Sequence, residues 1–147
     1  MSYALDTNVL LYASDTSSPV HDAAVAFLDQ CSKGPEPLYL AWQVVIGYLR
    51  VATHAAIFNR PLAHGEAVGN IEALLRLRHV HVLTEEGGFW DVYRKVAGEF
   101  PVRGNLVPDV HLAALLLQHG VRVLYTRDRD FLKFSFLEVR DPFVGDG

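Results

Sequence analysis

The sequence predicts an α/β fold with a central, mainly parallel five-stranded sheet flanked by helices. Short apolar runs alternate along the 147-residue chain with longer segments whose apolar residues repeat at helical spacing. Glycines and prolines separate these segments, as they do between strands and helices. Alternation of this kind is typical of a parallel sheet with crossover helices. Because no linker or internal repeat divides the chain, we expect one domain over residues 1–147.

The first elements follow from local patterns near the N-terminus. Tyr3–Leu5 is apolar and predicts a short buried strand, after which a helix opens over residues 8–12. Ser18 and Pro19 suit the N-cap and first turn of a second helix, which Gly34-Pro35 ends. The same reasoning predicts, in order, a strand at 38–41, helices at 43–54 and 66–78 and a strand at 80–83.

The remaining elements complete the sheet. Thr84 suits the N-cap of a helix over 85–100, and 101–108 reads as a loop. A strongly apolar helix over 110–119 then ends at Gly120, a residue that readily adopts the left-handed conformation of a helix end. A fourth strand at 121–125 and a weaker fifth at 137–139 follow.

Composition excludes several classes of protein. Half of the residues are hydrophobic and a fifth are charged, which is typical of a globular protein. We expect no membrane span and no secretory signal, since apolar runs are short and no basic stretch precedes the first. Cys31 is the only cysteine, so the chain has no internal disulfide or Cys-rich zinc site, and a reducing cytoplasm is the expected location. The net charge of −4 argues against a broad basic surface for nucleic acid, but not against an enzyme whose metal ions meet phosphate.

Carboxylates recur at one edge of the predicted sheet. Asp6 ends the first strand, Asp128 and Asp130 follow the fourth, and Asp109 opens the helix that leads into the fourth. Because ligands of parallel sheets bind at the carboxyl ends of the strands, we expect these acids to share one cleft. Mg²⁺ and Mn²⁺ prefer oxygen ligands and activate water for attack on phosphorus. The pattern therefore favours a metal-dependent phosphodiester hydrolase.

Each acid also has a structural interpretation. Asp6 and Asp109 suit helix caps or first turns, a role worth about 1 kcal/mol each. Asp128 suits a turn in which its side chain bonds the backbone, and Asp130 suits a solvated position. Taken together, acids at matching positions of the fold favour the metal site, although spacing alone does not decide.

Five stretches of the chain resemble the PIN-domain family, and within it the VapC-type toxins of bacterial toxin–antitoxin pairs. They are LDTNVLLY at 5–12, WQVVIGYLRVATH at 42–54, GNLVPDVHLAAL at 104–115, TRDRDF at 126–131 and LEVRDP at 137–142. The resemblance implies a three-layer PIN-like fold and a metal-dependent endoribonuclease that cleaves structured RNA, such as tRNA or rRNA, and inhibits translation. It also implies a cognate VapB-like antitoxin that blocks the cleft, and a homodimer.

By position, the resemblance implies a set of four catalytic acids: Asp6, Asp109, Asp128 and Asp130. The first three are the implied ligands of Mg²⁺ or Mn²⁺, and Asp130 is the accessory acid. One position departs from the family pattern, because many relatives carry a Glu three residues before an Arg and this chain has Gly47 before Arg50. Glycine costs about 1 kcal/mol relative to alanine in a helix interior, which indicates close packing or approach of a ligand.

Gly47 keeps a second hypothesis open, namely a PIN-fold RNA-binding or antitoxin-bound protein with weak catalysis. A third hypothesis is a phosphotransfer enzyme or receiver domain. It is disfavoured because Asn8 occupies the place of the second aspartate in the usual phosphatase signature.

Other side chains near the predicted cleft admit two roles each. Arg127 and Arg129 suit contacts with RNA phosphate or surface ion pairs. Thr126 suits a hydrogen bond in the cleft or a structural position, and His111 is expected to be structural. Tyr48 suits the core or a groove that binds the antitoxin.

Overall fold

One sheet organises the protein. The computed structural model describes residues 1–144, so residues 145–147 of the predicted single domain lie outside the described residues. The strands are β1 (Tyr3–Leu5), β2 (Leu38–Ala41), β3 (Val80–Leu83), β4 (Val123–Tyr125) and β5 (Glu138–Arg140). Their order is β3-β2-β1-β4-β5, and every neighbouring pair is parallel. The predicted five-stranded parallel sheet is confirmed.

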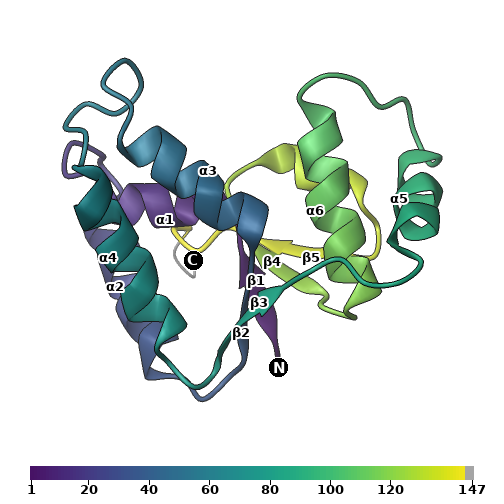
Figure 1. Ribbon diagram of the computed structural model, residues 1–147, viewed down its shortest axis with the longest axis horizontal. Helices are drawn as coiled ribbons and strands as arrows, with labels where there is room; N and C mark the ends of the chain where they lie inside the picture. The colour runs from purple at the N-terminus through teal and green to yellow at the C-terminus, as the bar shows by residue number, and fades with distance from the viewer. Residues whose placement is uncertain (145–147) are drawn as a thin grey trace.

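Helices cover both faces of this sheet (Figure 1). The helices before β3 are α1 (Thr7–Ser14), α2 (His21–Lys33), α3 (Trp42–Ala52) and α4 (His64–Leu75), and those after it are α5 (Phe89–Ala97), α6 (Leu106–Gln118) and the short 3₁₀-helix η1 (Arg129–Lys133). Helices α1 to α4 pack on one another, α5 packs on α6, and α6 contacts η1. From β1 the chain adds β2 and then β3 on one side. It then crosses to the other side of β1, where it adds β4 and β5. Right-handed crossovers therefore put the two groups on opposite faces, which gives three layers.

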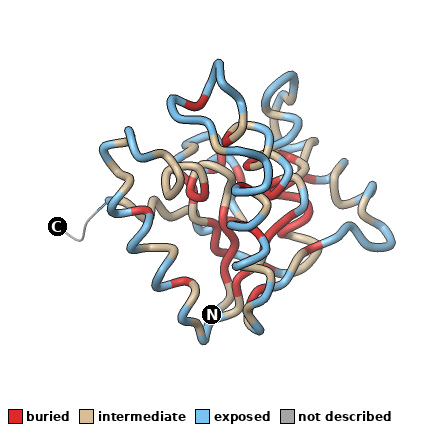
Figure 2. The backbone as a smooth tube through the Cα atoms, turned by 60° about the vertical axis from the view of Figure 1, so that its left-hand side comes forward, coloured by how far each residue is buried: buried red, intermediate tan, exposed pale blue. Residues whose placement is uncertain are grey.

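The buried segments gather in the middle of the molecule (Figure 2). The central strand and the last long helix carry much of this core. All of β1 is buried, because it lies between β2 and β4 and under helices. In α6 the run Leu112–Leu116 is buried throughout, as expected for a helix between a sheet and another helix. Asp6 directly follows β1 and Asp109 directly precedes the buried part of α6, so both acids lie where the apolar core ends.

Several helix ends differ from the prediction: α3 spans Trp42–Ala52 where 43–54 was expected, α4 spans His64–Leu75 where 66–78 was expected, and α2, α5 and α6 begin elsewhere. Helix α5 begins at Phe89, not Glu85, because Gly88 at its N-cap has a φ of 83° that continues no helix. Helix α6 begins at Leu106 within the predicted loop, since Pro108 is tolerated in a first turn where its missing N–H is not needed. Helix α2 begins at His21, after a turn in which the Ser18 hydroxyl accepts a hydrogen bond from the Val20 N–H. Within residues 1–144 no helix is long and apolar enough to cross a membrane.

Candidate metal centre

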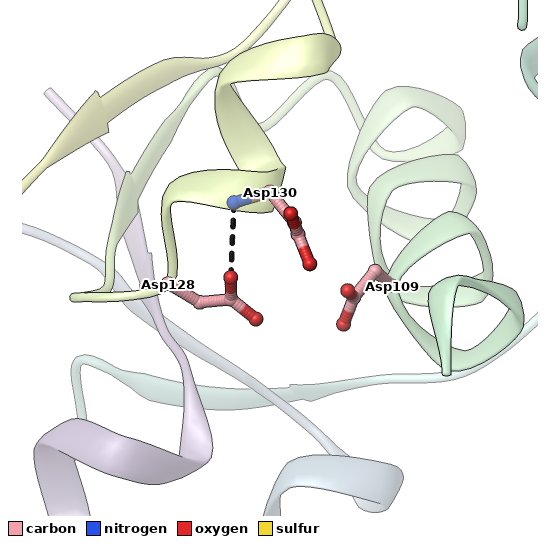
Figure 3. A group of neighbouring side chains, drawn as sticks. All are labelled: Asp109, Asp128 and Asp130. Carbon is pink, nitrogen blue, oxygen red and sulfur yellow. Dashed lines mark hydrogen bonds between the residues drawn. The ribbon is translucent and has the colours of Figure 1, made fainter. Parts of the chain in front are cut away.

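Three of the predicted acids meet at the carboxyl edge of the sheet (Figure 3). Asp109 comes from the first turn of α6, Asp128 from the turn after β4, and Asp130 from η1. One carboxylate oxygen of each lies within 4.8 Å of the others. Figure 3 shows Asp109 facing the other two side chains across a gap, with the Asp130 N–H donating to Asp128 Oδ1 at 2.9 Å. Segments far apart in the sequence thus deliver carboxylates to one place.

Asp6 lies beside this group without joining it. Its carboxylate accepts hydrogen bonds from the Thr7 N–H at 2.7 Å, the Thr126 hydroxyl at 2.8 Å and the Asn8 amide at 3.2 Å. Burial raises the pKa of Asp6, the Thr126 and Thr7 hydrogen bonds oppose that rise, and the charge of Asp128 adds to it. Asp6 therefore caps α1, as its structural interpretation requires, and also feels the acids of the neighbouring group.

Thr126 connects the two parts of the site. Its side chain is buried, with 2 % exposed, and its hydroxyl donates to Asp6. The same oxygen accepts from the Asn8 amide and from the Asp128 N–H, both at 3.0 Å. Asn8 completes the connection, because its side-chain oxygen accepts from the Arg127 N–H at 3.2 Å. This network fixes the turn that carries Asp128 against the end of β1.

Asp109 is electrostatically strained in the absence of a cation. Burial raises its pKa to about 7, with further increases from the charges of Asp128, Asp6 and Asp130 and a small opposing effect of Lys133. Like charges at short distance disfavour simultaneous ionisation. A cation between the carboxylates would remove that cost.

The donor set fits a hard divalent cation. It consists of carboxylate oxygens from three segments, without a cysteine or histidine among them. Oxygen-only sites of this kind suit Mg²⁺, Ca²⁺ and Mn²⁺ rather than softer metals. The arrangement is therefore a candidate metal-ion site.

Helix α3 passes close to the Asp6 side of the site. A Cβ built on Gly47 would lie 3.2 Å from Thr7 Oγ1. The Thr7 hydroxyl in turn donates to the Val44 carbonyl of α3 at 3.3 Å. The close packing that a glycine at position 47 indicated is present, and a side chain there would press on Thr7.

Gln43 is a neighbour of the site that the sequence reasoning missed. It lies in the first turn of α3, and its amide nitrogen donates to the Pro108 carbonyl, next to Asp109, at 3.1 Å. In the sequence it is a polar residue at the start of a mainly apolar helix, one turn before Gly47. That position on the same helix face was the available signal.

With one exception, the other candidate side chains near the site are paired with side chains of the same chain. Arg127 pairs with Asp141 at 3.3 Å, which is its predicted ion-pair role. His111 pairs with Glu85 and lowers the pKa of that carboxyl, in keeping with a structural role. The exception is Arg129, which is exposed and makes no ion pair within residues 1–144.

One cavity adjoins the acidic site, and another lies away from it among the helices before β3. The first, of about 360 Å³, adjoins Asp128 and has a mixed lining: Thr126, Arg127, Asp128, Arg129, Leu132, Val139, Asp141 and Val144. The second, of about 340 Å³, is mainly apolar and lies among α1, α2, α3 and α4, where Tyr48 forms part of the wall. The Tyr48 hydroxyl contacts the Ser14 hydroxyl and accepts from the Asn70 amide, so the buried end of this side chain is satisfied.

The chain is similar to known proteins over nearly its whole length. The sequence model of the PIN domain matches residues 3–137. Over 145 residues the chain is 46 % identical to Ribonuclease VapC48 of Mycobacterium tuberculosis, covering 99 % of this chain and all of that protein.

Two solved structures have the same fold at low sequence identity. The first is VapC20 of Mycobacterium tuberculosis, a Sarcin-Ricin loop cleaving toxin, with a TM-score of 0.67 and 17 % identity over 95 % of this chain and 99 % of that one. The second is VapBC2 from Rickettsia felis bound to a promoter DNA fragment, with a TM-score of 0.66 and 15 % identity over 95 % and 98 % of the two chains.

Proposed function

This chain belongs to the PIN-domain family, and we propose that within it the protein is a VapC-type toxin, a metal-dependent endoribonuclease held in check by a VapB-like antitoxin. The observation that carries the proposal is the meeting of Asp109, Asp128 and Asp130 in a chain 46 % identical to a VapC ribonuclease. Its substrate is structured RNA, such as tRNA or rRNA, and its place of action is the cytoplasm. The similarity to VapC20 supports this substrate class, since that protein cleaves the Sarcin-Ricin loop.

The four acids have two proposed roles at the metal site. Asp6, Asp109 and Asp128 are the proposed ligands of Mg²⁺ or Mn²⁺, with Asp130 as the accessory acid. When bound, the cation supplies the Lewis acidity that activates water and neutralises charge developing on the phosphate. Asp109 must lose its proton before it can hold a cation, so its raised pKa makes binding weaker in acid.

The mixed cavity beside Asp128 is the proposed contact for the RNA backbone. Arg129 lines it, is exposed, and carries a charge that complements phosphate. Arg127 lines it too, but Asp141 already neutralises that guanidinium, and the rings of Tyr12 and Phe143 lie 5.6 and 5.8 Å from it. Arg129 is thus the better candidate for phosphate, and Arg127 shapes the wall.

The apolar cavity among α1 to α4 is the proposed binding site of the antitoxin. Leu10, Leu28 and Leu74 line it, and Val25 at its rim is 46 % exposed. An amphipathic helix that lays its apolar side into such a groove is a common mode of peptide recognition. The structure from Rickettsia felis is that of a VapBC pair, which supports a protein partner of this type.

A homodimer remains a proposal. On α3, Trp42 and Ile46 lie one turn apart and are 48 % and 58 % exposed, which suits a face covered by a second copy. Light scattering on the purified chain at increasing concentration measures the mass, and a constant monomer mass contradicts the proposal.

The test of the proposed function is inducible expression of the chain in a bacterial host, followed by sequencing of RNA 5′ ends. We expect growth arrest and new, discrete RNA ends with the wild type and neither with Asp128→Asn. Asp91→Asn, at an exposed position of α5, is the matched control and should behave as the wild type.

Identical growth and RNA ends with all three proteins, at equal soluble levels, would contradict the nuclease. That outcome would favour the second hypothesis, a PIN-fold binding protein of weak catalysis, for which Gly47 in place of the usual Glu is the supporting observation.

A further inference from the structure

One buried oxygen of α3, in a side chain whose amide bonds the residue before Asp109, has no hydrogen-bond partner. It is Oε1 of Gln43, and among residues 1–144 no other buried side-chain nitrogen or oxygen lacks a partner. Buried amide oxygens in folded proteins nearly always accept a hydrogen bond from protein or ordered water. A buried acceptor without a donor is costly, so the surroundings of Gln43 should contain a reason for it.

The other end of the Gln43 amide fixes which way the oxygen points. Its nitrogen donates to the Pro108 carbonyl at 3.1 Å. A carbonyl can only accept, so turning the amide over would put two oxygens against each other. The orientation is therefore set by chemistry, and Oε1 faces away from the Pro108 carbonyl.

Gln43 stands on the helix face that spans the two parts of the site. Its amide is bonded to the residue that precedes Asp109. Gly47 follows one turn later on the same face of α3, and it lies against Thr7, whose N–H donates to Asp6. The face that carries residues 43 and 47 thus reaches from the helix that Asp6 caps to the helix whose first turn carries Asp109.

A neutral oxygen suits this position better than another charge. The carboxylates of Asp109, Asp128 and Asp130 already lie within 4.8 Å of one another, so a further negative charge there would add to their mutual repulsion. The usual family Glu would come from position 47, and Gly47 supplies no side-chain oxygen. An amide oxygen from one turn earlier accepts a hydrogen bond without adding negative charge.

We propose that Oε1 of Gln43 accepts a hydrogen bond from a water of the hydrated divalent cation at the acidic site, and so replaces the oxygen that the usual Glu would provide. Gln43 is then a positioning residue for the cation. Mg²⁺ in sites with few carboxylates keeps several waters, which gives such an oxygen a donor. The inference rests on the proposed function, because it requires a cation at that site.

The test is isothermal titration calorimetry of the full chain with Mn²⁺ alone. It compares the wild type with Gln43→Met and Gln43→Glu. Methionine keeps the length of the side chain and loses both hydrogen bonds, whereas glutamate keeps oxygens and loses only the donor to Pro108. Partners beyond the direct ligands change metal affinity by about 10- to 100-fold. We therefore expect Gln43→Met to bind Mn²⁺ at least about tenfold more weakly, and Gln43→Glu to bind at least as tightly as the wild type.

Gln30→Met, the same exchange at an exposed position of α2, is the control and should leave Mn²⁺ affinity unchanged. Thermal unfolding in EDTA checks that each variant is folded. Wild-type affinity in Gln43→Met overturns the inference and leaves the proposed function in place. Equal weakening in the Met and Glu variants assigns the effect to the Pro108 bond and also overturns it.

Two further results also have a defined interpretation. If Gln43→Met does not fold, Gln43→Glu still tests the oxygen, since binding weaker than the wild type contradicts the inference. If the wild type itself binds no Mn²⁺, the proposed metal dependence is wrong and the inference fails with it.

Discussion

The two sides of the acidic site are built in opposite ways. On the β1 side, Asp6 is surrounded by donors from Thr7, Asn8 and Thr126. On the α6 side, no side chain of the described residues donates a hydrogen bond to Asp109, and its pKa rises to about 7. The first carboxylate is held in place by the fold before any ligand binds. Burial raises the pKa of both carboxyls, but only at Asp6 do hydrogen bonds from the fold oppose that rise. The difference separates a carboxyl held by donors from one without them.

The largest effect should come from removing a charge on the α6 side of the site. We expect Asp109→Asn to lower RNA cleavage by more than about 100-fold, because loss of a proposed ligand should exceed the 10- to 100-fold effect of outer partners. The same change relieves repulsion, so the variant without metal should unfold at a higher temperature than the wild type. Cleavage of a structured RNA and thermal unfolding in EDTA measure the two quantities.

Asp6→Asn should also abolish cleavage, but with the opposite effect on unfolding. Its amide cannot accept from the Thr7 N–H, the Asn8 amide and Thr126 as the carboxylate does, so we expect a lower unfolding temperature. Equal shifts of unfolding temperature in the two variants would show that the sides of the site are alike.

Stability without metal should fall as pH rises. The pKa of Asp109 is raised in the folded protein to about 7 from an ordinary value of 3.8. Between these values the folded state binds more protons than the unfolded state, so the free energy of unfolding decreases with increasing pH. The contribution of Asp109 is full below the ordinary pKa of 3.8 and is lost as pH rises through about 7.

Unfolding temperature measured in EDTA across this pH range checks the sign, with Asp109→Asn as the reference that lacks the group. We expect the difference between the two proteins to widen as pH rises. Addition of Mg²⁺ above the raised pKa should stabilise the wild type and leave the variant nearly unchanged. A difference that is constant across the range would contradict the raised pKa.

Much of the fold followed from the sequence because its signals are local. The strand at Tyr3–Leu5 and the helix end at Gly120 depend on runs of apolar residues and on one backbone conformation, and both lie where expected. The helix starts at Phe89 and Leu106 were misplaced, because Gly88 and Pro108 act there through backbone geometry that a propensity does not record.

The site was predictable only in part for a different reason. Acids at strand ends are visible in the sequence, and topology says that Asp109 and Asp128 share an edge of the sheet. Which oxygens approach within a few ångströms depends on side-chain packing, so the membership of Asp130 in the 4.8 Å group and the separate position of Asp6 required coordinates. Gln43 was missed because its partner, Pro108, is distant in sequence.

Thr126→Val tests the hydrogen bonds on the Asp6 side of the site. The side chain keeps its volume, but Asp6, Asn8 and the Asp128 N–H each lose a partner. Leaving buried polar groups unpaired costs about 1–3 kcal/mol, so we expect unfolding free energy to fall by that amount. Urea unfolding measures it. A loss below about 0.5 kcal/mol, the size of an ordinary surface substitution, would mean that water replaces the hydroxyl freely.

The smallest effect concerns the close approach of α3 to Thr7, on the Asp6 side of the site. Alanine in place of a helix-interior glycine should stabilise by up to about 1 kcal/mol, and Gly69→Ala in α4 should show this gain because nothing lies within 4 Å of the new Cβ. Gly47→Ala should gain less, since its Cβ would lie 3.2 Å from Thr7 Oγ1 and Thr7 also holds Asp6. Urea unfolding of both variants gives the two free energies. Equal gains would show that Thr7 yields without cost, and then the absence of a side chain at position 47 would not be explained by packing.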